Sequence, residues 1–368
     1  MHIVSFDIPF PPDYGGVIDV YYKLKALHAE GIKIILHCFA YGRSPSDELE
    51  KFCERVYYYP RHTTKSLLFN TLPYIVLSRE SESLKANLLE DDSPILMEGL
   101  HSTFLLSSPE LSDRNKIVRT HNVEHDYYEN LARVERNIFK KYYFYNEAGK
   151  LKKYESVLKK ANAIAAIAPN DVDYYSNLFS TVSYLPAFHP FDDVSIAPGK
   201  SDFAFYHGNL SVGENNEAAL FLVNSVFTNA KHKLIIAGSK PSAELIKAVR
   251  SNPAVKLLSD QTPGQIYDLV KNAQCNILPT FQSTGIKLKL LAALFTGRTC
   301  IVNTPMVQGT GLSDLCIIAD TADQMIQKLD EVMIKEECNE NELATRKSIL
   351  GKDFSNKANA QKLIMLLS

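Results

Sequence analysis

The sequence predicts an α/β protein built from two doubly wound, Rossmann-like domains. Apolar, strand-like runs alternate with helix-length segments along the whole chain, which is typical of parallel sheets covered by helices. At 368 residues, the chain also exceeds the length that one hydrophobic core usually supports. The alternation starts again after residues 187–200, which include Pro190 and Pro198, so we expect the linker between the domains there.

The first half opens with a strand over residues 2–6, a Gly- and Pro-rich loop over 9–16, a helix over 17–30 and a strand over 33–38. This order is a βαβ unit, which joins parallel strands. Further strands are expected at residues 56–59, 94–98, 116–120 and 163–168. A long helical pattern over roughly 130–160 precedes the last of them.

The second half repeats the alternation. Strands are expected at residues 202–207, 233–237, 255–258, 275–278, 299–302 and 315–318. A last helix covers about 355–367. We therefore expect domains over 1–190 and 191–350, with 351–368 crossing back to the first domain.

Composition excludes several classes of protein. A net charge of −2 argues against a nucleic-acid-binding protein. The six cysteines form no CxxC pair and no signal peptide is recognisable, which predicts reduced thiols in a cytoplasmic protein. No apolar run approaches the roughly 20 residues of a membrane span.

Ligands of doubly wound sheets bind beyond the carboxyl ends of the strands. This rule gathers several predicted loop residues around one central cleft between the two domains. They are Gly15, Gly16, Glu98, His121, Gly208, Asn209, Gly238 and the loop 285–289.

The stretch Ser283–Gly297 carries the strongest chemical signal. A Gly-bearing loop follows the strand at 275–278 and opens a helix, with Lys287 and Lys289 at its mouth. The free N–H groups of a helix start, a glycine that admits an anion and two lysines suit a diphosphate. An ordinary βα turn with solvated lysines is the alternative interpretation.

Six segments together resemble the GT-B glycosyltransferases, in particular family 4, the retaining nucleotide-sugar enzymes. The likeness extends over nearly the whole chain. The segments are Pro11–Gly16, Arg119–His125, Tyr206–Val212 with Asn216, Ala237–Ser239, Thr284–Leu291, and Asn303–Thr304 through Gly311–Leu312.

The resemblance implies a retaining hexosyltransferase that moves a sugar from a UDP-sugar or GDP-sugar to a glycan or lipid-linked acceptor in surface polysaccharide synthesis. It implies no metal and no other cofactor. His121 and Lys289 are then the catalytic residues. The donor phosphates would meet Gly15, Gly16, Gly208, Asn209, Gly285, Ile286, Lys287 and Lys289. The acceptor or the sugar would meet Glu98, His121 and Glu124.

Two departures from the family pattern leave alternatives open. Ala292 stands where the family usually has a ribose-binding glutamate, and Asn209 stands where many members have a phosphate-binding arginine. A degenerate, non-catalytic GT-B protein and a nucleotide-sugar epimerase are therefore retained as alternatives. If position 292 faces the ribose, an Ala292→Glu variant should bind UDP or GDP more tightly.

Residues 133–160 carry nine lysines and arginines, three glutamates and the aromatic run Tyr142–Tyr145. Cations interleaved with aromatic residues can bind an anionic lipid surface, which would place the protein at the inner face of a membrane. The alternative is a solvated helix with a buried aromatic stripe.

Overall fold

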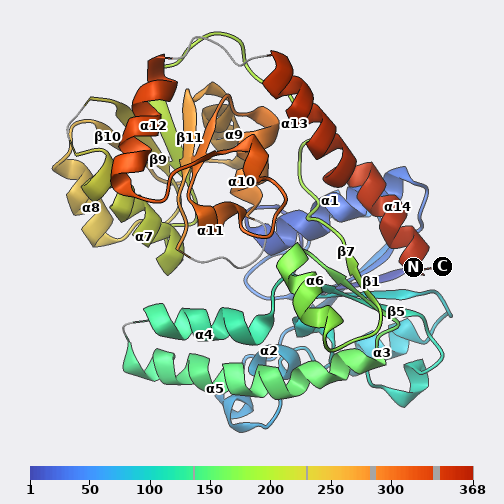
Figure 1. Cartoon of the computed structure of the whole chain (residues 1–368). Helices are drawn as coiled ribbons and strands as arrows, with labels where there is room; N and C mark the ends of the chain where they lie inside the picture. The colour runs from blue at the N-terminus through green and yellow to red at the C-terminus, as the bar shows by residue number, and fades with distance from the viewer. Residues whose placement is uncertain (136, 229–230, 282–286, 335–339, 368) are drawn as a thin grey trace. The chain divides into compact units, whose positions relative to one another are not determined.

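The computed structural model describes residues 1–135, 137–228, 231–281, 287–334 and 340–367. The chain forms two compact units (Figure 1). Unit 1 combines Met1–Pro190 with Phe354–Ser368, and unit 2 covers Phe191–Asp353.

Unit 1 contains a seven-stranded sheet in the order β3-β2-β1-β4-β5-β6-β7, and all its neighbouring strands are parallel. The strands are β1 (His2–Ser5), β2 (Ile35–Ala40), β3 (Arg55–Pro60), β4 (Ile95–Glu98), β5 (Lys116–Thr120), β6 (Ala163–Ala166) and β7 (Val182–Tyr184). Chain order reverses between β1 and β4, so the switch point of the sheet lies there.

Both faces of this sheet are buried because successive side chains of a strand point to opposite sides. Ile3 packs in one apolar cluster with the helices α1 (Gly15–Ala29) and α14 (Asn356–Leu367), while the next residue, Val4, packs in the cluster of the opposite face. The helices α1 and α14 lie side by side (Figure 1). The segments near the two ends of the chain therefore share one core.

The remaining helices of unit 1 are α2 (Tyr74–Leu77), α3 (Glu82–Leu88), α4 (Glu124–Val134), α5 (Ile138–Tyr154) and α6 (Pro169–Ser176). The short 3-10 helices are η1 (Asp47–Lys51), η2 (Lys65–Phe69), η3 (Leu100–Ser102), η4 (Pro109–Leu111) and η5 (Glu155–Lys160). The single helix expected over 130–160 was wrong. Asn137 starts a new helix, because its side chain accepts hydrogen bonds from the backbone N–H groups of Phe139 and Lys140.

Unit 2 contains a six-stranded parallel sheet in the order β10-β9-β8-β11-β12-β13. The strands are β8 (Phe203–His207), β9 (Lys233–Ala237), β10 (Val255–Leu258), β11 (Cys275–Leu278), β12 (Cys300–Val302) and β13 (Ile317–Ile318). The helices are α7 (Gly213–Phe221), α8 (Ala243–Arg250), α9 (Pro263–Asn272), α10 (Leu288–Thr296), α11 (Thr304–Val307), α12 (Ala322–Ile334) and α13 (Glu340–Asp353), with a π turn η6 (Leu222–Val226) and a 3-10 turn η7 (Ser313–Leu315).

These two parallel sheets with covering helices confirm the predicted α/β class. In unit 2 the chain order reverses between β8 and β11, and the residues after these two strands include the predicted phosphate-binding loops. Among the described residues, no helix combines the length and the apolar character needed to cross a bilayer.

Candidate functional site

The loop after β1 brings Gly15 and Gly16 to the start of α1. A side chain at position 16 would force the Phe6 ring to move, since a Cβ atom there would lie 2.6 Å from Cζ of Phe6. Tyr14 precedes the helix without capping it, and its hydroxyl donates to Asp7 at 2.9 Å. The first N–H groups of α1 therefore lack a cap from this side chain, which leaves them suited to an anion.

A buried network of four charged side chains lies beneath this end of unit 1. The ammonium of Lys23 contacts Asp19 Oδ2 at 2.9 Å and Glu98 Oε1 at 2.6 Å. On the other side of Asp19, Arg119 contacts Oδ1 at 3.1 Å. The side chains of all four are at most 1% exposed. Two carboxylates and two cations therefore balance each other inside the core.

His121 joins this network at its edge. Its Nε2 atom lies 3.0 Å from Glu98 Oε2 and 3.9 Å from Asp19 Oδ2. The His121 side chain is 10% exposed, whereas that of Glu98 is 0% exposed. The structure thus brings together two of the predicted site residues, of which only His121 reaches the surface.

Asp19, Glu98 and His121 also have ligand atoms close enough together to hold a metal ion. The two carboxylates, however, already bind the ammonium of Lys23. Burial alone would raise the pKa of Asp19, but Arg119 and Lys23 outweigh it and keep that pKa below its ordinary value. This donor set fits an internal ion-pair network better than a cation site.

Glu124, the third predicted sugar or acceptor contact, opens α4 and is 3% exposed. Burial, reinforced by the nearby Asp171, raises the pKa of Glu124 to about 8 against the opposing charge of Arg79. Its Oε1 atom lies 3.9 Å from Nδ1 of His101. Neither atom has a hydrogen-bond partner among the described residues, so both are available to bond to a ligand.

In unit 2, Lys289 lies in the first turn of α10 and reaches the start of α7. Its ammonium donates to Asn215 Oδ1 at 2.7 Å and lies 5.1 Å from the centre of the Tyr206 ring. Burial, reinforced by the charge of Lys287, lowers the pKa of Lys289 to about 8, although Glu214 opposes the shift. A neutral amide and an aromatic ring hold this charge, so it remains available to an anion.

Lys287 reaches the same helix end as Lys289 although the two are only two residues apart. Lys287 precedes α10 with extended backbone, and its ammonium lies 3.1 Å from Glu214 Oε1. The Glu214 carboxylate also accepts a hydrogen bond from the hydroxyl of Thr280. Two residues this close together would diverge on a helix surface, but Lys287 lies outside the helix, so both lysines can reach the start of α7.

Gly208 and Asn209 follow β8, where chain segments approach closely. A Cβ atom at Gly238 would lie 2.0 Å from the carbonyl oxygen of Gly208, so glycine is required at that crossing. The side-chain oxygen of Asn209 accepts from the backbone N–H and the hydroxyl of Ser211, at 3.1 and 2.7 Å. Gly285 and Ile286, the other predicted phosphate contacts, lie outside the described residues.

Position 292, where the family usually has a ribose-binding glutamate, lies in the interior of unit 2. Ala292 is 1% exposed and lies in an apolar cluster with Phe205, Ala237, Val270 and Ala273. A carboxylate there would be buried among hydrocarbon groups, which is costly.

Sequence reasoning missed the partners that hold the predicted residues: Asp19, Lys23, His101, Tyr206, Glu214 and Asn215. The spacing of Asp19 and Lys23, four residues apart in one helix, is that of an ordinary surface ion pair. Both residues are buried on the same helix face as Val20 and Leu24. Only this burial shows that they form an internal ion pair.

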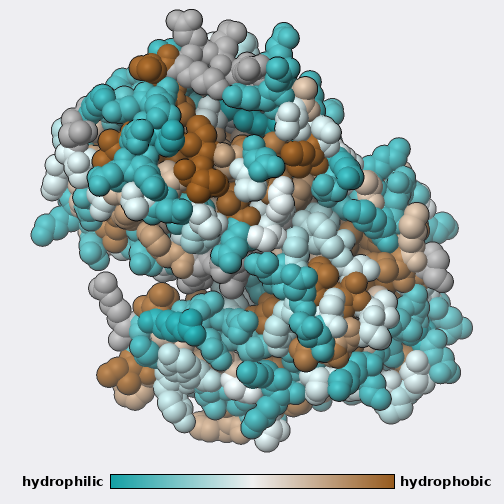
Figure 2. All heavy atoms as spheres, viewed as in Figure 1, coloured by the Kyte–Doolittle hydropathy of each residue, from teal (hydrophilic) through white to brown (hydrophobic). Residues whose placement is uncertain are grey.

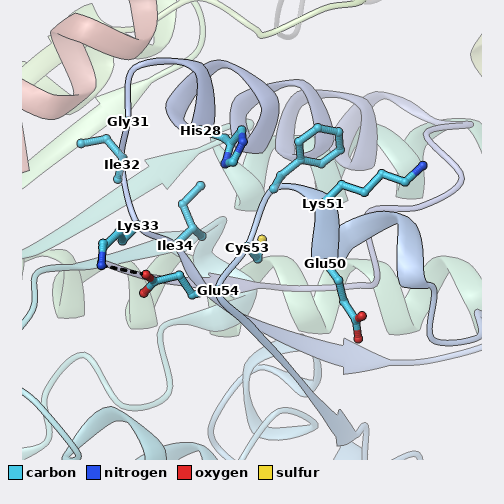
Figure 3. Close-up of a pocket in the computed structure, with 10 residues that line it drawn as sticks. His28, Gly31, Ile32, Lys33, Ile34, Glu50, Lys51, Cys53 and Glu54 are labelled. Atoms are coloured by element: carbon cyan, nitrogen blue, oxygen red, sulfur yellow. Dashed lines mark ion pairs between the residues drawn. The ribbon is translucent and has the colours of Figure 1, made fainter.

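A separate hollow of about 240 Å³ in unit 1 is lined by residues 28, 31–34 and 50–54 (Figure 3). It lies at the start of β2 and β3, the edge opposite to the carboxyl ends of the strands. Lys33 and Glu54, which both line it, pair at 3.1 Å, and burial raises the pKa of its Cys53 thiol to about 12. The hollow is therefore separate from the predicted site, and the raised pKa keeps its thiol protonated at neutral pH.

Comparisons with known proteins agree with this geometry. Residues 202–334 match the family described as glycosyl transferases group 1. A Klebsiella pneumoniae protein, described as an uncharacterised 44.6 kDa protein in the cps region, is 27% identical over 350 residues, covering 90% of this chain and 88% of that protein.

Solved structures show the same fold at low identity. A S. aureus TarM variant in complex with fondaparinux, α-GlcNAc-glycerol and UDP aligns with a TM-score of 0.64 and 12% identity over 100% of this chain and 99% of that chain. A glycosyltransferase from Rickettsia africae aligns with a TM-score of 0.64 and 13% identity, over 100% of this chain and 97% of that chain. Another TarM structure aligns over 77% of this chain but only 57% of its own, with a TM-score of 0.58 and 14% identity. The predicted resemblance to GT-B glycosyltransferases is confirmed.

Proposed function

We propose that this chain, a glycosyltransferase of the group 1 type, transfers a sugar with retention from a UDP-sugar or GDP-sugar to a glycan or lipid-linked acceptor. The observation that carries the proposal is the ammonium of Lys289, which is half-buried at the start of α7 and held by the neutral Asn215. Cleavage of a nucleotide sugar places charge on the β-phosphate, and a preorganised cation stabilises that charge.

In this mechanism the two lysines have different roles. Lys289 donates to the leaving phosphate, since no carboxylate among the described residues lies within ion-pair distance of it. The ammonium of Lys287 lies 3.1 Å from the Glu214 carboxylate, so Lys287 binds the phosphate only once the phosphate displaces that carboxylate. The start of α7 and the loop that begins at Gly208 offer backbone N–H groups to the donor. No metal or cofactor is part of the proposal.

His121 contacts the transferred sugar or the acceptor, and Glu98 supports His121. The complete burial of Glu98 favours this indirect role over a contact of its own. Glu124, whose pKa of about 8 keeps it protonated at neutral pH, donates a hydrogen bond to the same ligand. The cps-region relative from Klebsiella pneumoniae supports a role in surface polysaccharide synthesis.

The proposal is tested with a panel of UDP- and GDP-sugars. Titration calorimetry with UDP and GDP first identifies the nucleotide, and proton NMR of the first-formed sugar product then reads its anomeric configuration. Binding of one nucleotide followed by an α-configured product from an α-linked donor supports retaining transfer.

Other results of this panel identify the alternatives. A β-configured product would overturn the retaining mechanism. A changed sugar that is still attached to the nucleotide would identify an epimerase, and failure to bind any nucleotide would identify a degenerate protein.

We further propose that α5 contacts an anionic membrane surface, where a lipid-linked acceptor would reside. On α5, Ile138, Phe139 and Tyr142 are 79%, 86% and 75% exposed, and Lys140 and Lys141 lie between them. Figure 2 shows hydrophobic surface at the end of the α4–α5 hairpin. Apolar side chains bordered by lysines match the apolar interior and the negative headgroups of such a surface.

Vesicle flotation tests this contact. The protein should float with vesicles that contain phosphatidylglycerol and not with phosphatidylcholine vesicles, and Phe139→Ser with Tyr142→Ser should abolish flotation. Phe69→Ser, at a residue 91% exposed on η2, is the matched control. Equal flotation of the double variant would exclude α5 as the contact.

A further inference from the structure

Glu98 links Lys23 to His121, and this link determines how the imidazole is presented. One carboxylate oxygen, Oε1, accepts from Lys23 at 2.6 Å, and the other, Oε2, lies 3.0 Å from Nε2 of His121. Both oxygens are thus engaged, and the side chain has no exposed surface. Lys23 also contacts Asp19, so it is itself fixed between two carboxylates.

The charge state of Glu98 decides which imidazole nitrogen carries the proton. Burial alone would raise the pKa of Glu98, but Lys23 and the hydrogen bond to His121 outweigh it and lower that pKa. An ionised carboxylate only accepts hydrogen bonds, so the Nε2 atom facing it must carry a hydrogen. In a neutral imidazole the other nitrogen, Nδ1, is then an acceptor.

Nδ1 of His121 has no hydrogen-bond partner among the residues that the structure describes. The ring packs edge-on against Phe6, at 5.4 Å between centroids and an interplanar angle of 84°. Phe6 has no N–H or O–H group, so it cannot satisfy the nitrogen. The side chain is 10% exposed, so a ligand can reach part of it.

We propose that the Lys23–Glu98 pair fixes the Nε2–H tautomer of His121, so that Nδ1 accepts a hydrogen bond from a sugar hydroxyl. His121 touches the substrate, whereas Glu98 and Lys23 are positioning residues. An acceptor nitrogen selects a hydroxyl and rejects a phosphate oxygen, which has no hydrogen to donate. The identity of the hydroxyl rests on the proposed glycosyl transfer, whereas the tautomer rests on the contacts and the ionised state of Glu98.

The tautomer is measured on wild-type protein, without any assay of activity. Imidazole ¹⁵N shifts are recorded on protein labelled with ¹⁵N-histidine, and a His121→Asn variant identifies the resonances of residue 121. The proposal expects a protonated Nε2 and an unprotonated Nδ1 at pH 7.5. A proton on Nδ1 in wild type would overturn the proposal.

The positioning role is tested with Glu98→Gln. The glutamine amide can donate to Nε2, so we expect the proton of His121 to move to Nδ1. We expect kcat to fall by about 100-fold, while the KM for the donor sugar stays within about twofold. Glu90→Gln, at an exposed carboxylate, is the matched control and should change neither quantity.

Circular dichroism and the affinity for UDP or GDP report whether Glu98→Gln remains folded. A folded Glu98→Gln protein with the wild-type tautomer and wild-type kcat would contradict the positioning role. The expected tautomer in a wild-type protein that transfers no sugar would instead overturn the sugar hydroxyl and the proposed function.

Discussion

The ammonium of Lys289 lies 2.7 Å from the side-chain oxygen of Asn215, so a neutral amide holds this half-buried charge. The same amide donates to the carbonyl oxygen of Asn209 at 3.0 Å, which fixes its orientation. The ammonium of Lys289 is therefore already positioned for a phosphate, and the phosphate need not displace a counter-ion first.

Replacing Lys289 by alanine should weaken binding of UDP or GDP by about 10- to 100-fold, because a hydrogen bond to a charged group contributes roughly 1.5–3 kcal/mol. Titration calorimetry on the folded variant provides the measurement. Lys256→Ala, at an exposed lysine of β10, is the control and should bind as wild type does. Unchanged affinity in Lys289→Ala would show that phosphate binds elsewhere.

Nucleotide affinity should also fall as the pH rises through about 8. Burial lowers the pKa of Lys289 to about 8, so above that pH the free protein loses the proton on which phosphate binding depends. Affinity measured between pH 7 and pH 9.5 should decrease by up to about tenfold per unit above the pKa. Lys289→Arg retains its charge over this range and should remove the decrease. The same decrease in the arginine variant would assign it to another group.

Ala292→Glu should lower stability and leave nucleotide affinity no better than that of wild type, contrary to the expectation from sequence. The new carboxylate would enter the apolar cluster around Phe205 and Val270, at a cost of about 3 kcal/mol or more. Urea denaturation measures this loss. Ala243→Glu, at an exposed first residue of α8, is the control and should be nearly neutral. A stable Ala292→Glu protein with tighter nucleotide binding would restore the expectation from sequence.

Stability should fall in mild acid because of a buried histidine pair. His2 Nδ1 and His37 Nε2 lie 2.8 Å apart, and the two outer nitrogens contact Asp91 at 3.0 Å and the Tyr59 hydroxyl at 2.8 Å. Burial lowers the pKa of both histidines, that of His37 to about 3. Below about pH 6.5 the unfolded chain therefore binds protons at these histidines that the folded protein does not bind.

The free energy of unfolding should consequently drop by about 2 kcal/mol for His37 between pH 6.5 and pH 5, at about 1.4 kcal/mol per unit. Urea titrations over this range measure the slope. His37→Gln should flatten the slope, whereas His62→Gln, at an exposed histidine, should not change it. An equal slope in both variants would show that other groups cause the acid sensitivity.

Most of the sheet could be predicted because each parallel strand is an apolar run between turn residues. The exception is β7 (Val182–Tyr184), which has three half-buried residues at the end of the sheet and lacks a distinct apolar run. The break before α5 was missed as well, because the helical pattern continues across Asn137 and only its cap shows that a new helix starts.

The candidate site was harder to predict than the fold, because its decisive contacts join residues that are distant in sequence. Lys23 and Glu98 are 75 residues apart, and Lys289 and Asn215 are 74 apart. Position along a strand or loop indicated Glu98, His121 and Lys289. It could not reveal that Glu98 is enclosed, or that Lys287 and Lys289 both reach the start of α7.

The balanced charges of Asp19, Lys23, Glu98 and Arg119 also restrict how this protein can diverge. Removing any one of them leaves a buried charge without its partner, which typically costs 3–5 kcal/mol, about half of the stability of many domains. Exchange of the whole group for apolar residues avoids that cost but also removes the support beneath His121. Descendants of this chain that still use His121 should therefore inherit the four residues as a set, and lineages that lose one should lose the others soon afterwards.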